Sequence, residues 1–526
     1  MKRMVYLMIV IIVVVMIIIL IKTAVKPNRQ SLDQTEMTQT GKPVILLIVD
    51  SLMNEPLQQA VKKDRAPALQ FLMEHGRLYP DVVSSYPTMS VTIDSTLLTG
   101  TYSDKHRVPG LVWYDENEKR LVNYGSAREE VFKLGVKQVA EDNLYKLNHK
   151  HLNRDVKTIH ETLADAGQQS ASINALVYRG NEKKTLHIPE VAAKLKLAPE
   201  TLHIKTPALF SYGMLSQFSP KNDQHIGPFE KFGFNDAFSA QELKHLIQND
   251  KLPAFTIAYF PELDQEVHKN GPKEHIDAIA KTDKQVQEVL NTYESWDEAL
   301  NSAIWIVMGD SGQAEVGNDK NQSLIRLKDM LDDYNIYKVT EQVKKDDQIV
   351  LGHNERMAFI YILDEAIRQE EVVKKLQKDE RIGFLAWKDG SSVHVAANGH
   401  KEIFTFRPDG PYRDSYGQTW TIKGDPSVLD MTVHGVVIEY KTYPDALARL
   451  HSSLHSHSGT YIIADAKPGF EFQGEGTPIH LGGAAHGALH EQDTIVPVIV
   501  TGTDTKPRHM RIVDLYAWMI DLTKNR

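Results

Sequence analysis

Four short runs of consecutive apolar residues predict the strands of a buried sheet. They occupy Pro43–Val49, Ala254–Phe260, Ala303–Met308 and Ile495–Val500. An unbroken apolar run is typical of a strand that is covered on both faces, as in a parallel sheet between two layers of helices. Pro497 interrupts the last run, and because proline has no N–H to donate to a neighbouring strand, it predicts an edge or a bulge there.

Segments with helical spacing of apolar residues separate these strands. They lie around Ala66–Gly76, Ile276–Tyr293 and Ser323–Tyr334. Strands that alternate with helices predict an α/β protein in which helices cover both faces of a mostly parallel sheet.

Two long stretches interrupt this alternation, at about 115–250 and about 352–433. The first is rich in Lys and His, and the second has short alternating runs with turn signals between them. We interpret both as inserted segments that cap or flank the sheet within one catalytic domain, which spans 42–526.

The N-terminus predicts a membrane anchor. Met4–Ile21 is apolar apart from Tyr6 and is just long enough to cross the hydrocarbon layer as a helix, with Lys2 and Arg3 before it. A cleaved signal peptide has a shorter apolar region and a clear small-x-small site, so we favour an uncleaved anchor at 1–27. The polar segment 28–41 then acts as a linker, and similar numbers of basic residues on both sides leave the orientation open.

Composition narrows the chemistry. The chain has 526 residues, a net charge of -9 and no cysteine. An acidic chain without a dense basic run is a poor nucleic-acid binder, so no such partner is expected. Without cysteine there are no disulfides or thiolate ligands, and any metal ion must be held by His, Asp, Glu or hydroxyl oxygen.

Acidic residues and a histidine follow three of the predicted strands. Asp50 ends the first, Asp264 and His268 follow the second, and Asp310 ends the third. Ligands of open α/β sheets bind beyond the carboxyl ends of the strands, so these side chains are expected to converge there. The i, i+4 spacing lets Asp264 and His268 face one ion, and His486 in a glycine-rich loop is a candidate for a further nitrogen ligand.

A hydroxyl lies at the start of another predicted helix. Ser90 ends the segment Tyr86-Pro87-Thr88-Met89-Ser90 and precedes an apolar run that leads to Thr99-Gly100. Taken singly, Ser90 is more often a helix cap and each acid a turn former or cap. The order of all these residues at the ends of strands favours a metal site instead.

These residues resemble the motif order of the alkaline phosphatase superfamily, and within it the type I phosphodiesterases and nucleotide pyrophosphatases. The resemblance rests on Asp50, the segment Tyr86–Ser90, the Asp264-x-x-x-His268 pair before Gly271-Pro272, Asp310-x-Gly312 and His486-Gly487. It implies the α/β/α sandwich of that superfamily and two divalent metal ions, most often zinc.

The resemblance also assigns roles. It places the nucleophile on Ser90, the first ion on Asp264, His268 and His486, and the second ion on Asp50, Asp310 and Ser90. A divalent ion lowers the pKa of a bound hydroxyl, which allows a serine to attack phosphorus as an alkoxide.

The chain departs from the family at Ser311, where the family has histidine. Hydroxyl is a weaker ligand for zinc than imidazole, so the second site is expected to favour Mn²⁺ or Mg²⁺, or to recruit Gln313 or another histidine. His480 and His490 flank His486 and are the candidates for such a histidine. The family also has an asparagine near the phosphate at the place of Leu111, so nucleotide pyrophosphatase activity does not carry over.

We therefore expect a membrane-anchored, metal-dependent phosphohydrolase of the phosphodiesterase type that forms a phosphoseryl intermediate. Its substrate would be a small-molecule or lipid-linked phosphate ester. Because relatives of this kind act outside the cytoplasm, we expect a single-pass cell-membrane protein with an extracellular catalytic domain. Two alternatives stay open: a transferase that moves a phospho-substituent onto a lipid or wall polymer, and a non-catalytic surface binding protein whose second metal site has decayed.

Overall fold

A computed structural model describes residues 27–524, apart from positions 34, 38–40, 195–196, 273–275 and 340–341. The apolar run Met4–Ile21, on which the predicted anchor depends, lies outside these residues. None of the helices in the described part of the chain has the length and apolar character that a membrane crossing requires. In the described part of the linker, Leu32 is buried in the core and Arg29 forms an isolated β-bridge with Gln217.

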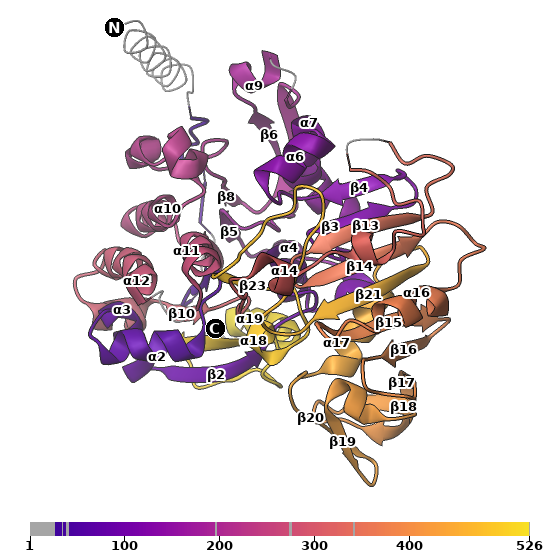
Figure 1. The fold of residues 1–526 in the computed structure, drawn as a ribbon. Coiled ribbons are helices and arrows are strands. Elements are labelled where there is room, and N and C mark those ends of the chain that lie inside the picture. Colours follow the sequence, from indigo (N-terminus) through magenta and orange to yellow (C-terminus); the bar gives the residue numbers. More distant parts are fainter. Residues whose placement is uncertain are drawn as a thin grey trace, which may run out of the picture.

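A seven-stranded sheet forms the centre of the domain (Figure 1). Its order is β2-β24-β10-β1-β9-β5-β8, and β24 runs antiparallel to both of its neighbours while the other pairs are parallel. The strands are β1 (Val44–Val49), β2 (Arg77–Val83), β5 (Ser170–Ile173), β8 (Leu209–Ser211), β9 (Phe255–Phe260), β10 (Ile304–Met308) and β24 (Ile495–Thr501). All four strands predicted from apolar runs are confirmed in β1, β9, β10 and β24.

Pro497 lies in β24, one strand in from the edge. The pairing of β24 with the edge strand β2 shifts register between Tyr79 and Val82, opposite Pro497. The predicted irregularity is therefore a bulge in the neighbouring strand β2. Because the two strands are not in regular register there, the N–H that proline lacks is not needed for their pairing.

Helices cover both faces of the sheet because alternate residues of each central strand point in opposite directions. In β1, the side chains of Ile45 and Leu47 belong to a core shared with α2 (Asn54–Lys62), α3 (Pro67–Glu74), α10 (Asp236–Gln248) and α12 (Ile276–Leu290). Those of Leu46 and Ile48 belong to a core shared with α4 (Ser90–Thr99) and α19 (Ile512–Lys524). The mostly parallel α/β sandwich is confirmed, as are the helices predicted around 66–76 and 276–293.

The helix predicted at Ser323–Tyr334 is wrong. This segment contains the end of α14 (Lys320–Ser323), the short strand β12 (Leu324–Ile325) and α15 (Leu327–Met330). β12 pairs in parallel with β22 (Glu471–Phe472), and both of its residues are fully buried or nearly so. Pairing with a strand that is distant in the sequence thus overrode the local helical pattern.

A second sheet of nine strands packs beside the first and runs from Ile349 to Ala466 (Figure 1). It extends beyond the segment 352–433 at both ends. Its strands are β13 (Ile349–Asn354), β14 (Met357–Ile362), β15 (Ile382–Asp389), β16 (Ser392–Ala396), β17 (Phe404–Arg413), β18 (Thr419–Lys423), β19 (Met431–His434), β20 (Val437–Tyr440) and β21 (Tyr461–Ala466). Its helices are α16 (Gln369–Leu376), η4 (Pro426–Leu429) and α17 (Ala446–Leu454).

The remaining elements are short. The segment 115–250, interpreted above as an insertion that caps or flanks the sheet, also contains β5, β8 and α10 of the central layers, and beyond these it contributes two hairpins and several small helices. These elements are β3 (Val112–Asp115), β4 (Arg120–Asn123), β6 (Glu182–His187), β7 (Thr201–Thr206), α6 (Arg128–Leu134), α7 (Val136–Glu141), η1 (Asp142–His151), α8 (Ile159–Asp165), α9 (Glu190–Lys194), η2 (Pro220–Gln224) and η3 (Pro228–Gly233). Elsewhere lie α5 (Ser103–His106), α11 (Glu262–Asn270), α13 (Trp296–Ser302), α18 (Glu491–Thr494), β11 (Ala314–Glu315) and β23 (Ala484–Ala485).

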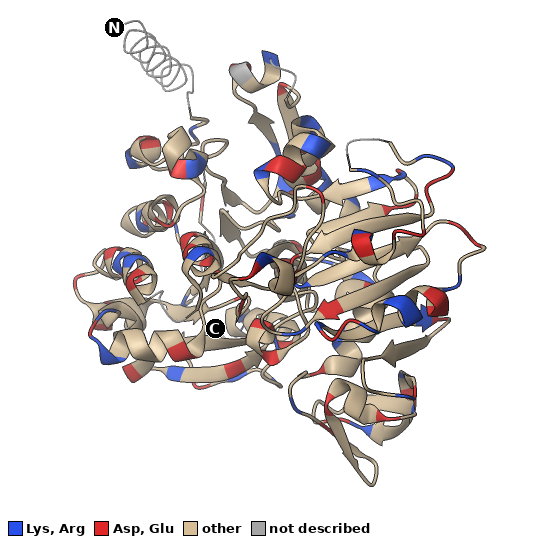
Figure 2. Cartoon of the chain, viewed as in Figure 1, with Lys and Arg blue, Asp and Glu red and all other residues tan. Residues whose placement is uncertain are grey.

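Charged side chains of both signs are mixed on the outer helices (Figure 2). Lys244 of α10 and Glu288 of α12, for example, form an ion pair of 2.7 Å across the two helices. Such half-exposed pairs contribute little to stability because water screens them.

One ion pair differs because it is fully buried. Arg356, in the turn between β13 and β14, pairs with Asp493 of α18, and neither side chain is exposed. Arg356 also donates to the carbonyl oxygens of Ala466 (2.9 Å) and Phe470 (3.2 Å), while Asp493 accepts from the N–H of Ala488 (3.2 Å). The pair joins the second sheet to the loop that carries His486.

Replacing Arg356 with methionine should destabilise the protein by about 3–5 kcal/mol, because Asp493 would stay buried without its countercharge. Urea unfolding followed by circular dichroism measures this. Lys244→Met, which breaks the half-exposed pair with Glu288, is the control and should unfold close to wild type. An Arg356→Met midpoint equal to that of the control would contradict the structural role of the pair.

Candidate active site

The carboxyl ends of three neighbouring strands carry the predicted acids. In the order β10-β1-β9, Asp310 lies two residues past β10, Asp50 directly follows β1, and α11 begins after β9 with Asp264 in its first turn. Because the strands are parallel and adjacent, residues far apart in sequence meet at one edge of the sheet.

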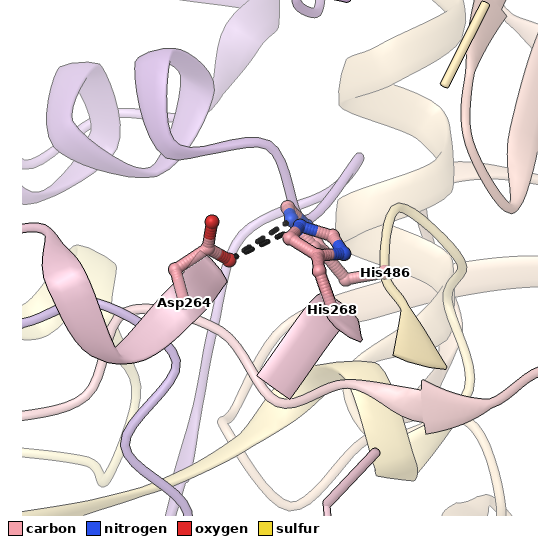
Figure 3. A group of neighbouring side chains, drawn as sticks. All are labelled: Asp264, His268 and His486. Carbon is pink, nitrogen blue, oxygen red and sulfur yellow. Dashed lines mark ion pairs between the residues drawn. The ribbon is translucent and has the colours of Figure 1, made fainter. Parts of the chain in front are cut away.

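Asp264, His268 and His486 form one compact group (Figure 3). The Asp264 Oδ1 atom lies 3.2 Å from His268 Nε2 and 3.7 Å from His486 Nε2. The two α11 residues face the same way because they are one helical turn apart. His486 reaches them because β23, which precedes it, pairs with β11, which follows the loop after Asp310.

The outer nitrogen of each imidazole holds a proton against a backbone carbonyl. His268 Nδ1 lies 2.9 Å from the Ala484 oxygen, and His486 Nδ1 contacts the Thr88 oxygen. A carbonyl oxygen only accepts hydrogen bonds, so both Nδ1 atoms are donors and both neutral rings carry their lone pair on Nε2. These lone pairs point into the group, which is the tautomer that a metal ligand needs.

The charges in this group are strongly coupled. Although burial opposes it, the Asp264 carboxylate raises the pKa of His268 to about 10. Burial likewise opposes ionisation of Asp264, but His268 and His486 lower the pKa of its carboxyl below the usual range. Without a metal ion, a proton on the His268 ring therefore balances the Asp264 carboxylate.

Asp50 and Asp310 are buried beside this group, and each has one oxygen without a hydrogen-bond partner in the described part of the chain. The other Asp310 oxygen accepts the N–H groups of Ser51 (3.0 Å) and Ser311 (2.8 Å), and the other Asp50 oxygen accepts the Tyr259 hydroxyl. Burial raises the pKa of both carboxyls, and for Asp50 the nearby charge of Asp310 adds to this. Unpaired buried carboxylate oxygens are costly unless a cation or proton compensates them.

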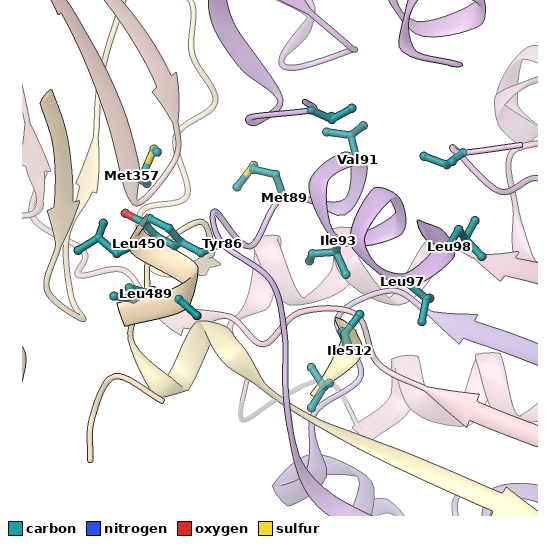
Figure 4. Packing of buried hydrophobic residues seen from close by; sticks show 14 of the residues in the cluster. Tyr86, Met89, Val91, Ile93, Leu97, Leu98, Met357, Leu450, Leu489 and Ile512 are labelled. Atoms are coloured by element: carbon teal, nitrogen blue, oxygen red, sulfur yellow. The ribbon is translucent and has the colours of Figure 1, made fainter. Parts of the chain in front are cut away.

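Ser90 is the first residue of α4 and is half-buried, while Met89 occupies the cap position. The alternative that Ser90 is the helix cap is therefore wrong. Apolar side chains on both sides of the segment, including Tyr86, Met89, Val91 and Ile93, hold it in the core (Figure 4).

Thr88 connects the Ser90 segment to the His486 loop. Its hydroxyl accepts the Gly487 N–H (2.7 Å), and its carbonyl accepts the His486 ring proton. Two residues earlier, the Tyr86 hydroxyl donates to Asp465 (2.9 Å), which also accepts the N–H of Leu489 (2.8 Å). Ser90 and His486 are therefore placed by one hydrogen-bonded unit.

Ser51 and Gln313 lie near Ser311, the position at which the family has an imidazole. Ser311 is fully buried, with its Oγ atom 3.4 Å from that of Ser51. Gln313 Nε2 donates to Asp264 Oδ1 (2.7 Å) and to Ser51 Oγ (2.9 Å), and the Gln313 Oε1 atom is buried without a partner among the described residues.

Of the two candidate histidines, His480 lies at the site, because its ring stacks on that of His268 with centroids 4.3 Å apart. His490 instead caps α18 by accepting the N–H of Gln492 (3.2 Å).

Sequence reasoning missed two acids. Asp94 is fully buried in α4, and neither of its carboxylate oxygens has a hydrogen-bond partner within the described chain. Burial, and then the charge of Asp310, raise its pKa. Its spacing of four residues from Ser90 was a signal, because it puts both side chains on one face of the helix. Glu355 lies against the histidines of the first group (3.8 and 4.0 Å), and no local pattern marked it.

Solved structures of other proteins share this fold. A search of curated proteins found no match. Among solved structures, murine ectonucleotide pyrophosphatase / phosphodiesterase 5 is similar, with a TM-score of 0.55, 14% identity, and coverage of 92% of this chain and 95% of that one. Phosphonoacetate hydrolase from Sinorhizobium meliloti 1021 in complex with phosphonoformate has a TM-score of 0.54, 13% identity, and coverage of 95% and 100%. At these identities the likeness shows a shared fold.

The family comparison goes further. Residues 44–405 match the model of the family described as type I phosphodiesterase / nucleotide pyrophosphatase, which is more than half of the chain. The match begins at β1 and includes Asp50, Ser90, Asp264, His268 and Asp310. The chain therefore belongs to the type I phosphodiesterase / nucleotide pyrophosphatase family and is a phosphoric ester hydrolase.

Proposed function

We propose that this chain is a metal-dependent phosphodiesterase that uses Ser90 as its nucleophile. The observation that carries the proposal is the convergence of Asp264, His268 and His486, joined through Thr88 to the segment that ends in Ser90. Family membership supports the same reaction class.

The first group of residues fits a zinc ion. It offers two imidazole nitrogens in the required tautomer and one carboxylate oxygen, with the three atoms within 4.8 Å of one another. Two histidines and a carboxylate are a known ligand set of catalytic zinc.

The second group fits an ion that prefers oxygen. Asp50 and Asp310 each have a buried oxygen without a partner among the described residues, and Ser90 would add a hydroxyl. With Ser311 in place of an imidazole, this set contains no nitrogen, which favours Mn²⁺ or Mg²⁺ over zinc. Asp94 adds a further buried carboxylate. Burial raises the pKa of Asp94, and the nearby charge of Asp310 raises it further.

The chain's own residues supply most of the reaction. Ser90 Oγ would attack phosphorus and expel the alcohol, and water would then release the phosphoryl group from Ser90. Because Ser90 opens α4, the free N–H groups and the positive end of that helix face the phosphate. When bound, the ions would supply an acidified hydroxyl and positive charge for the phosphate oxygens.

The substrate and the cellular location are further parts of the proposal. We infer a phosphodiester rather than a monoester, either a small molecule or lipid-linked. The apolar run Met4–Ile21 supports a single-pass anchor in the cell membrane, with the catalytic domain outside. Transfer to a lipid or wall polymer, instead of to water, uses the same nucleophile.

Ser90→Ala should lower the turnover of bis-(nitrophenyl) phosphate by more than about a hundredfold, because the attacking oxygen is lost. The assay uses the full chain with Zn²⁺ and Mn²⁺, alone and together. Ser90→Thr is the matched control, since it keeps a hydroxyl and should retain measurable turnover. Turnover of Ser90→Ala within about tenfold of wild type would remove Ser90 as nucleophile. If the wild type turns over lipid-linked donors only, the transferase alternative is favoured.

Ser311→His should raise zinc binding at the second site, because it restores an imidazole beside Asp310. Metal content after dialysis against zinc, measured by plasma emission spectrometry, should rise toward two ions per chain. Ser311→Ala is the control and should not gain zinc. If both variants bind the same amount as wild type, another residue already fills the place of the imidazole.

A further inference from the structure

Glu355 faces the same two ring nitrogens as Asp264 does. Its Oε1 atom lies 3.8 Å from His268 Nε2, and its Oε2 atom lies 4.0 Å from His486 Nε2. The corresponding distances from Asp264 Oδ1 are 3.2 and 3.7 Å. Two carboxylates thus approach the two imidazoles, although the resemblance to known phosphodiesterases implied only Asp264.

The second sheet holds Glu355 in this position. Glu355 and Arg356 form the two-residue turn between β13 and β14, where Asn354 pairs with Met357. Glu355 has a φ of 56°, a left-handed conformation that is strained for a side chain other than glycine. The Glu355 carbonyl accepts the Phe472 N–H (2.8 Å), and the Arg356 N–H donates to the His486 carbonyl (2.9 Å).

Glu355 and His486 are also bonded to each other directly. The His486 N–H donates to Glu355 Oε2 at 3.1 Å. The hairpin and the histidine loop therefore move as one unit, and any ion held by His486 lies within reach of Glu355.

Two carboxylates and two imidazoles are buried together at this point. The Glu355 side chain is 9% exposed and that of His486 is 6% exposed. Both Nε2 atoms face the two carboxylates, because each ring uses its Nδ1 proton on a backbone carbonyl. A divalent cation would bind all four groups in place of a ring proton and neutralise the two negative charges.

We propose that Glu355 is a fourth protein ligand of the first metal ion, together with Asp264, His268 and His486. The proposal rests on the proposed function, which places an ion on the other three. In a tetrahedral zinc site with bonds of about 2.0–2.1 Å, neighbouring ligand atoms lie about 3.4 Å apart. The separations from Asp264 Oδ1 are 3.2 and 3.7 Å, and those from the two different Glu355 oxygens are 3.8 and 4.0 Å, so the Glu355 side chain must shift to bring one oxygen to the ion.

His480 belongs to the surroundings of this ion. It forms a group with His268 and Glu355 whose ligand atoms lie within 4.8 Å of one another. However, His268 has one free ring nitrogen and can serve one ion, so the two groups share a single site. His480 is held by Glu471, which accepts from its ring Nδ1 (2.8 Å) and its backbone N–H (2.7 Å), and it stacks on His268 as a positioning residue.

Four protein ligands have a consequence for metal binding, and water or phosphate would then enter as a fifth ligand, which catalytic zinc can accept. The first ion would be held tightly by this chain even while the second site, which lacks an imidazole at Ser311, is empty. Glu355 therefore sets the affinity of the first site.

Zinc affinity of the full-length Glu355→Gln protein tests the proposal. Competition with a chromophoric chelator should show affinity about tenfold or more below wild type, because one charged ligand is lost. Visible absorption of the Co²⁺-substituted protein should also change, since its intensity reports the number of ligands. Glu355→Asp keeps a carboxylate on a shorter side chain, and its zinc affinity should lie between those of the wild type and Glu355→Gln.

Glu266→Gln is the matched control. Glu266 lies on α11 between Asp264 and His268, is 40% exposed and pairs with Lys281 at 3.6 Å. Its loss removes the same charge close to the site but no ligand, so zinc affinity should stay near wild type. Circular dichroism of the metal-free proteins checks that all variants fold.

Three results decide the matter. Zinc affinity and a Co²⁺ spectrum of folded Glu355→Gln equal to those of wild type would overturn the role of Glu355, while the loss of turnover in Ser90→Ala would leave the proposed function intact. If Glu266→Gln lowers zinc affinity as much as Glu355→Gln does, the loss of a nearby negative charge explains the effect. That result would also overturn the role of Glu355 as a ligand. Failure of the wild type to bind zinc would reject both proposals.

Discussion

Burial of both faces of three neighbouring parallel strands is the constraint on which this structure depends. Because β10, β1 and β9 are covered by helices on each side, their residues are apolar until the strands end, except for Thr256 and Tyr259 of β9. Acidic residues first appear at the carboxyl ends. Asp50, Asp264 and Asp310 meet there as a consequence of strand order, and Thr88, two residues before Ser90, contacts His486 at the same edge.

The cost of burying these acids indicates what the site is built to hold. Asp50, Asp94 and Asp310 carry buried oxygens for which no partner exists among the described residues. Asp493, by contrast, has a partner for each oxygen, Arg356 for one and the Ala488 N–H for the other. Unsatisfied carboxylates that gather at one place, next to imidazoles, are a low-energy arrangement only when cations or protons compensate their charge.

The second sheet is more than a covering layer. Its β13–β14 turn contributes Arg356, which ties it to Asp493, and the adjacent Glu355, which reaches the histidines. One strained two-residue turn therefore supplies both the attachment of the sheet and a carboxylate at the site. Thr88 makes the corresponding connection on the other side, between Ser90 and His486.

The sequence by itself determined the central strands, the acids that end them and the spacing of Asp264 and His268, because these follow from local burial and helical period. It also determined family membership through the order of the motifs. Only the tertiary structure decided that Ser323–Tyr334 is not one helix, that His480 rather than His490 lies at the site, and that Asp94 and Glu355 join it. These outcomes depend on strand pairing and on contacts between residues far apart in the chain, and apart from the four-residue spacing of Ser90 and Asp94 no local pattern of residues signals them.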